Sequence, residues 1–324
     1  MIEFLILNAS WLCFPVAALF IWVMVRRRGL VRWLALPLLA FTGLFIWGRY
    51  IEPRILTVHE ETILLPGASE TSPTIRIALF SDTHLGMFGN AIPMRRIVDR
   101  INTQKVDAAF LAGDIMFHPH VEDIPQQLAP LADLNAPLYA VLGNHDVGRP
   151  GPDLSSPVMA ALDAADATLV QNRAFDVTLG GQRVIVAGAS DLWQLQQDFS
   201  FSADLPEGVP VLLLTHNPDT ARFVPDVFEY SLMLAGHTHG GQIRIPFVYK
   251  RYIPTNWPFD KGLHVFPSDG GDRLVYVTTG TGMSGLPIRL FMPPRIDVLT
   301  LHLPAPYKGV SNPTASVSSE PSSE

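Results

Sequence analysis

The chain has 324 residues, which is enough for one large domain or two ordinary ones, and its formal net charge is −7. This acidic balance, with no basic stripe outside the segment next to the first apolar residues, argues against nucleic acid as a stable partner. The single cysteine, Cys13, excludes an internal disulfide and a cysteine-based zinc site. Residues 304–324 are mostly Pro, Ser, Ala and Glu, a composition that predicts a disordered tail.

Two apolar stretches open the chain. Phe4 to Val25 carries no charge and, at about 1.5 Å per residue, is long enough to cross a bilayer as a helix. Leu30 to Trp47 carries one charge near its start, and tryptophans mark both of its ends, as in interfacial belts. Residues 1–48 are therefore predicted to be two transmembrane helices, with the lipid bilayer as a partner. A cleavable signal is the alternative, but no positive charge precedes the first run and no small-residue cleavage pattern ends it.

The charges around these stretches predict an orientation. Four basic residues crowd the short connection between the two runs: Arg26, Arg27, Arg28 and Arg32. The positive-inside rule places this connection in the cytoplasm, so the rest of the chain is predicted on the periplasmic side of a cell inner membrane. If translation began at Met24, the pair Arg27-Arg28 before an apolar run would resemble a twin-arginine export signal, which also sends the domain outward.

The remainder of the chain predicts an α/β domain. Residues 49–73 are polar and contain Pro and Gly, and they read as a linker with a strand near Thr57 to Leu65; the domain is placed at 74–303. Helical spacing of apolar residues predicts helices at Met94–Asn102 and Ser156–Ala165, and part of a helix within Ile124–Leu134. Short apolar runs predict strands at Ile75–Phe80, Val106–Leu111, Leu138–Leu142, Val184–Ala187, Val211–Leu214, Ser231–Ala235, Leu274–Thr278 and Ile296–Leu303.

Polar residues gather where these predicted strands end, the edge at which α/β sheets bind ligands. Taken singly, each could cap a helix or make a turn, but five strands that end in carboxylate, carboxamide or imidazole groups predict a divalent metal site. Mn, Fe and Zn all accept such oxygen and nitrogen ligands. The spacing of His237 and His239 lets both rings face one site, between glycines that allow a close backbone approach. The full set is Asp82, His84, Asp114, Asn144, His145, His216, His237 and His239.

The same residues resemble the signature of the calcineurin-like metallophosphoesterases. Its blocks stand here, in order, as Asp82-Thr83-His84, Gly113-Asp114, Gly143-Asn144-His145-Asp146, His216 and Gly236-His237-Thr238-His239. The continuation Gly240-Gly241-Gln242 and the apolar N-terminus look most like the membrane-anchored YkuE/YaeI-type phosphodiesterase branch. A Pro-Glu pair often precedes the last strand in that branch, whereas this chain has Pro294-Arg295. The resemblance implies a β-sandwich flanked by helices in four layers.

The resemblance also implies roles for the site residues. One metal would be held by Asp82, His84, Asp114 and His239, and a second by Asp114, Asn144, His216 and His237, with Asp114 as the bridge. Two such cations would clamp the phosphate and activate hydroxide for in-line attack. His145 would stabilise developing charge or protonate the leaving oxygen, with Asp146 as its orienting partner; a purely structural role for His145 is the alternative.

The predicted function is a membrane-anchored, dinuclear-metal phosphodiesterase whose phosphoester substrate is lipid-linked or otherwise associated with the envelope. One alternative is a UDP-2,3-diacylglucosamine pyrophosphatase-type hydrolase of lipid A synthesis, which needs a cytoplasmic active site. Another is a catalytically silent membrane scaffold or metal sensor.

Four further features of the sequence each allow two interpretations. His118 and His120 line the cleft or lie in a solvated loop, and Arg289 binds a substrate phosphate or forms a surface ion pair. Asp191 reaches the site or caps a helix. The aromatic segment Ile245 to Pro267 faces the substrate or the membrane, or it is ordinary packing.

Overall fold

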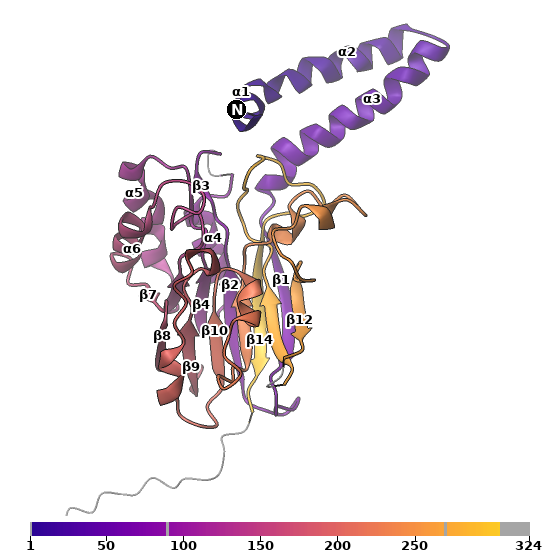
Figure 1. The fold of residues 1–324 in the computed structure, drawn as a ribbon. Coiled ribbons are helices and arrows are strands. Elements are labelled where there is room, and N and C mark those ends of the chain that lie inside the picture. Colours follow the sequence, from indigo (N-terminus) through magenta and orange to yellow (C-terminus); the bar gives the residue numbers. More distant parts are fainter. Residues whose placement is uncertain (1, 89–90, 269–270, 305–324) are drawn as a thin grey trace, which may run out of the picture.

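The computed structural model describes residues 2–88, 91–268 and 271–304, and it shows a helical hairpin joined to a domain of two packed sheets (Figure 1). The predicted tail, 304–324, lies outside the described residues beyond Pro304. The four-layer β-sandwich implied by the family resemblance is confirmed. Its layers are a group of helices, a first sheet, a second sheet and a layer of short helices and loops.

The first sheet has the strand order β1-β14-β2-β4-β6-β7. Neighbouring strands are parallel except that β14 runs antiparallel to β2. Its strands are β1 (Thr57–Leu64), β2 (Thr74–Phe80), β4 (Ala108–Ala112), β6 (Leu138–Val141), β7 (Thr168–Leu169) and β14 (Arg295–His302). The strand predicted near Thr57 to Leu65 is therefore present as β1, and it lies at the edge of the sheet beside β14, so this part of the predicted linker belongs to the sandwich.

The second sheet has the order β12-β13-β11-β10-β9-β8. Its strands are β8 (Arg173–Leu179), β9 (Gln182–Gly188), β10 (Val211–Leu214), β11 (Leu232–Ala235), β12 (Gly262–Phe266) and β13 (Arg273–Val277). The outer strands β8 and β12 pair antiparallel with their neighbours, while the four central strands are parallel. A small third sheet joins β3 (Leu85–Gly86) to β5 (Met116–Phe117).

Alternation along the strands explains why the first sheet is covered on both faces. In β2, Ile77 and Leu79 pack into the core between the sheets, whereas Ala78 and Phe80 pack against the helices. The covering helices are α4 (Met94–Asn102), α5 (Ile124–Leu128) and α6 (Ser155–Asp163). The buried face of α4, which includes Ile97 and Val98, has the helical spacing that the sequence predicts. Because β2, β4 and β6 are parallel, their carboxyl ends lie at the same edge of the sheet.

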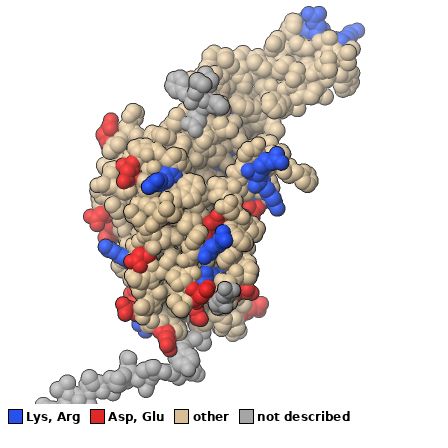
Figure 2. Space-filling view, viewed as in Figure 1, with Lys and Arg blue, Asp and Glu red and all other residues tan. Residues whose placement is uncertain are grey.

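The N-terminal hairpin consists of α1 (Ile2–Ala9), α2 (Cys13–Arg26) and α3 (Leu30–Ile46), and Figure 1 shows it projecting from one end of the domain. Ile6–Arg26 and Leu30–Arg54 are long and apolar enough to cross a membrane. Large apolar side chains such as Trp22, Trp33 and Phe41 are exposed on it. The visible face of the hairpin is uncharged up to its far turn, where arginine side chains gather (Figure 2). Burying such a surface in water-free surroundings is favourable, which suits a bilayer.

The base of the hairpin is bonded to the domain. The buried Glu52 accepts hydrogen bonds from Trp47 Nε1 at 2.7 Å and from the Met292 backbone N–H at 2.5 Å. The carbonyl of Gly48 accepts from the backbone N–H of Arg289 at 2.9 Å. The hairpin thus leaves the domain beside the segment that precedes β14.

Candidate metal centre

The residues predicted to bind metal converge at the carboxyl ends of strands from both sheets. Asp82 and His84 follow β2, Asp114 follows β4 and Asn144 follows β6, while His216 follows β10 and His237 and His239 follow β11. Five of these seven residues have left-handed backbone angles, with φ between 43° and 71°: Asp82, His84, Asp114, His237 and His239. Such angles are uncommon outside glycine and concentrate at functional sites, where surrounding contacts hold them.

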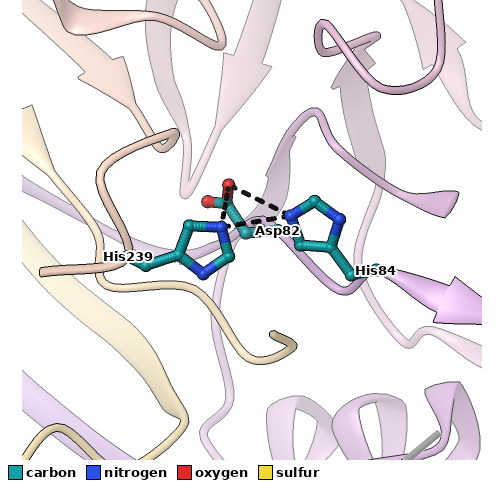
Figure 3. Close-up of side chains that lie close together, drawn as sticks. All are labelled: Asp82, His84 and His239. Carbon is teal, nitrogen blue, oxygen red and sulfur yellow. Dashed lines mark hydrogen bonds and ion pairs between the residues drawn. The ribbon is translucent and has the colours of Figure 1, made fainter. Parts of the chain in front are cut away.

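One group of donors contains Asp82, His84 and His239, shown in Figure 3. The Nε2 atoms of His84 and His239 lie 3.1 Å apart, and the His239 Nε2 is 3.3 Å from Asp82 Oδ1. All three side chains are buried, and their donor atoms point toward one another. Such mutual spacing of nitrogen and oxygen donors suits a borderline divalent cation.

A second group contains Asp114, His216 and His237, with Asn144 beside it. The His216 Nε2 lies 3.0 Å from His237 Nδ1 and 3.1 Å from Asn144 Oδ1. The opposite ring nitrogen of His216, Nδ1, donates to the Ala112 carbonyl at 2.8 Å. This bond fixes the orientation of the ring so that Nε2 faces the site, which is how outer partners orient metal-binding histidines.

Asp114 connects the two groups. Its Oδ2 is 3.6 Å from His84 Nε2 in the first group and 3.2 Å from His216 Nε2 in the second. Its Oδ1 accepts from the backbone N–H of His145 at 2.8 Å, so the carboxylate is held in a fixed direction. This position between the two groups suits a shared ligand, and the donor set fits two divalent cations.

The electrostatics of the site prepare most of its histidines for a metal. Burial lowers the pKa of His84 and of His237 to about 3, so both rings are neutral at pH 7. His216 differs: burial lowers its pKa, but the Asp114 carboxylate outweighs this effect and raises it to about 10. In the metal-free protein, His216 therefore carries a proton that a metal ion must displace.

This proton predicts a pH effect on metal uptake. At pH 7, below the raised pKa of His216, filling its site should release one proton, and His84 and His237 should release none. Apparent affinity should rise by about tenfold per pH unit from neutral pH up to the pKa of His216. Calorimetric titration of the metal-free protein in buffers of different ionisation heat measures the proton count. Uptake with no proton release at pH 7 would contradict the prediction.

Glycine is needed where the loops approach most closely. A Cβ on Gly236 would lie 2.6 Å from Asp82 Oδ2 and even closer to Ser81 Oγ, and a Cβ on Gly143 would overlap the Asp114 carboxylate. The expectation that glycines flanking His237 allow a close backbone approach is thus confirmed at Gly236.

Gly236→Ala should push Asp82 out of the first group of donors. Such overpacking costs typically about 1–3 kcal/mol, and here it falls on a ligand, so we expect weaker metal binding together with a lower melting temperature. Metal content after dialysis and a thermal melt measure both effects. Gly43→Ala is the control, because a Cβ there meets nothing within 4 Å. Full metal content in Gly236→Ala would contradict this reading.

His145 and Asp146 occupy different surroundings. The half-buried His145 ring lies edge-on to His84 at 5.1 Å between ring centroids, and it forms a donor group with His84 and Asp114. The buried Asp146 carboxylate accepts from the backbone N–H groups of Ile115, Met116 and Gly143. Asp146 therefore connects the loops after β4 and β6, and this connection positions the backbone of His145.

The side chains with two open interpretations are now located. His118 and His120 are exposed, in agreement with a solvated loop. Asp191 caps the short helix η6 (Leu192–Gln194) by accepting a hydrogen bond from the Trp193 N–H, and its side chain is fully buried. Burial raises the pKa of Asp191 to about 6, against the opposing effect of His216. Arg289 is fully buried rather than on the surface, and it donates to the carbonyls of Thr279, Gly282 and Met292. A surface ion pair for Arg289 is therefore wrong.

Three neighbours of the site were not predicted. Phe117 lies edge-on to His84 and His145, with ring centroids 5.4 Å and 5.0 Å away. Trp193 lies edge-on to His237 at 4.9 Å. Ser284 Oγ is 3.5 Å from His145 Nε2. None belongs to a spaced motif, so only the fold brings these side chains to the metal centre.

Comparison with known proteins agrees with this geometry. Residues 75–241 match the family model of the calcineurin-like phosphoesterases. The chain is 31% identical over 279 residues to the uncharacterized metallophosphoesterase YkuE of Bacillus subtilis, covering 85% of this chain and 95% of that protein. It is 30% identical over 288 residues to the phosphodiesterase YaeI of Escherichia coli, covering 86% of this chain and all of that protein.

A third relative is the UDP-2,3-diacylglucosamine pyrophosphatase LpxG of Chlamydia muridarum, with 26% identity over 307 residues, 79% of this chain and 92% of that protein. The family predicted from the spaced motifs is thereby confirmed, and with it the class of reaction. The chain belongs to the calcineurin-like metallophosphoesterases and is a metal-dependent phosphoester hydrolase.

Proposed function

We propose that this chain is a membrane-anchored phosphodiesterase with two divalent metal ions, acting on a phosphodiester in or near the membrane. The observation that carries the proposal is the Asp114 carboxylate, shared between two groups of buried donors. Two cations held 3.5–4 Å apart, roughly the spacing of such sites, would clamp a phosphate and supply hydroxide at neutral pH. Of the named relatives, YaeI supports a diester substrate.

The protein's own residues supply positioning and proton handling. Asp82, His84 and His239 would hold one cation, and Asn144, His216 and His237 the other. His145, beside both groups, would donate a proton to the leaving oxygen. Asp146 keeps the backbone of His145 in place through the amides that it accepts from.

The first test is turnover of bis-p-nitrophenyl phosphate by the full chain in detergent. We expect chelation to abolish activity and the addition of Mn, Fe or Zn to restore it. The ion that gives the highest rate identifies the best cofactor. A protein that binds two metal equivalents yet turns over no diester would support the silent scaffold or sensor instead. Turnover of monoesters alone would contradict the diester assignment.

The pyrophosphatase reading is the second candidate, and the similarity to LpxG favours it. The two candidates differ in topology, because a UDP-sugar substrate requires a cytoplasmic site, whereas the basic turn at Arg26 to Arg28 supports a domain on the periplasmic side of an inner membrane. An alkaline phosphatase fusion after Thr74 should be active. An inactive fusion, with an active reporter that works only in the cytoplasm, would support the pyrophosphatase reading.

A further inference from the structure

A strongly apolar loop tip remains unexplained by the metal centre. Residues 245–252, here called the tip loop, follow the metal-binding turn of His237 and His239. They expose Ile245, Phe247, Val248 and Tyr252, and the Phe247 side chain is 101% exposed. Phe247 also has φ 67°, a left-handed angle that costs a residue with a Cβ roughly 1–2 kcal/mol. Nothing in the described fold packs against this side chain to offset that cost.

The base of the tip loop is firmly held, so the exposed tip is not a frayed segment. Arg244 donates to the Gly240 carbonyl at 2.7 Å and pairs with Asp260 Oδ2 at 2.6 Å. Its guanidinium also lies over the Tyr249 ring, 4.1 Å from the centroid. Because Gly240 directly follows His239, this hydrogen bond connects the base of the tip loop to the metal centre.

The tip loop and the hairpin leave the domain at the same end. Arg244 N–H donates to the Leu290 carbonyl at 2.8 Å, and the adjacent Arg289 N–H donates to Gly48 at the base of the hairpin. The single segment around Leu290 therefore touches both elements. Figure 1 agrees: an orange loop near residue 250 projects outward beside the base of the hairpin.

The charges of this region suit an anionic lipid surface. Residues 243–259 contain Arg244, Lys250 and Arg251 and no Asp or Glu. Arg244 is neutralised by Asp260, which leaves the exposed Lys250 and Arg251 beside the exposed aromatic rings. Aromatic side chains with flanking basic residues are the composition of segments that lie in the head-group layer.

We propose that the tip loop inserts Phe247 and its apolar neighbours into the head-group layer of an anionic bilayer, as a second membrane contact beside the hairpin. Two membrane contacts would fix the orientation of the domain relative to the bilayer, whereas the hairpin alone would allow this orientation to vary. The metal centre, which directly precedes the tip loop in the chain, would then be held close to phosphodiesters at the lipid surface. This inference rests on the proposed membrane anchoring but not on the identity of the substrate.

The test uses the full chain in vesicles of phosphatidylcholine with phosphatidylglycerol. In a Cys13→Ala background, which removes the single cysteine, an environment-sensitive NBD label is placed at Phe247→Cys. Val227→Cys is the matched control, since it is 91% exposed and belongs to the loop after η8 (Pro218–Arg222). A label at Phe41→Cys in α3 reports insertion of the hairpin.

We expect the label at position 247 to shift to the blue and to be quenched by lipids that carry a quencher near the head group. The label at 41 should be quenched by lipids that carry the quencher in the acyl chain, while the label at 227 stays in water. The double change Lys250→Glu and Arg251→Glu should weaken loop insertion in anionic vesicles by roughly fivefold or more for each of the two substitutions. It should have little effect in neutral vesicles. Quenching at 41 without quenching at 247 would overturn the tip-loop proposal alone. Absence of quenching at both positions would overturn the membrane anchoring too. A blue shift at 247 without lipid quenching would mean that the label contacts protein, within this domain or in another copy of the chain, and would equally overturn the proposal.

Discussion

Asp114→Asn should abolish most of the phosphoesterase activity while leaving the fold intact. The substitution keeps the size of the side chain and removes the charge that faces both donor groups, at 3.6 Å from His84 Nε2 and 3.2 Å from His216 Nε2. A neutral carboxamide is a poor bridge between two cations. Since metal ions supply several kcal/mol of transition-state stabilisation, and each 1.36 kcal/mol is about tenfold in rate, we expect kcat to fall by roughly a thousandfold or more.

The measurement that separates this cause from general damage is metal content. Asp114→Asn should retain fewer than two metal equivalents after dialysis, whereas Asp297→Asn, the control, should retain both. Asp297 is an equally buried carboxylate, but it accepts from Tyr276 and Thr278 between the sheets and does not belong to either donor group. Two bound metals with wild-type turnover in Asp114→Asn would refute the role of Asp114 as a shared ligand.

The sequence predicts the centre better than its surroundings. Runs such as Leu138–Leu142 and Val211–Leu214 are continuously apolar because their strands are buried on both faces, and such runs stand out without a structure. Once the strands are located, the polar residues that follow them are predicted to lie at the carboxyl ends of those strands. The sequence does not predict β8, because this strand lies at a sheet edge, where its Asp176 pairs with Arg183 of β9 on the exposed side.

The environment of single side chains was harder to predict. Arg289 follows a Gly- and Pro-rich loop that has no periodic pattern, yet it is fully buried because three carbonyls converge on its guanidinium. Phe117 reaches the metal centre from β5 and Trp193 from η6, and no local spacing encodes that meeting. Long-range packing, rather than propensity, decides such contacts.

His145→Ala should slow hydrolysis by roughly a hundredfold to ten-thousandfold, the usual range for one acid–base group, with both metals retained. The metals stay because the other donors of each group are untouched: Asp82 and His239 on one side, His216 and His237 on the other. His118→Ala is the matched control, since it also removes an imidazole that lies edge-on to Phe117, from a side chain exposed to solvent.

A series of aryl and alkyl diesters would distinguish the two roles open to His145. If His145 protonates the leaving oxygen, its removal should matter little for p-nitrophenol, which leaves as a stable anion, and progressively more as the leaving alcohol becomes less acidic. If the ring instead stabilises charge on the phosphate, the loss should be the same for every leaving group. The position of the ring, half-buried beside both donor groups and within 3.5 Å of Ser284 Oγ, favours the first outcome. Loss of a metal equivalent in His145→Ala, with no dependence on the leaving group, would instead make His145 a ligand.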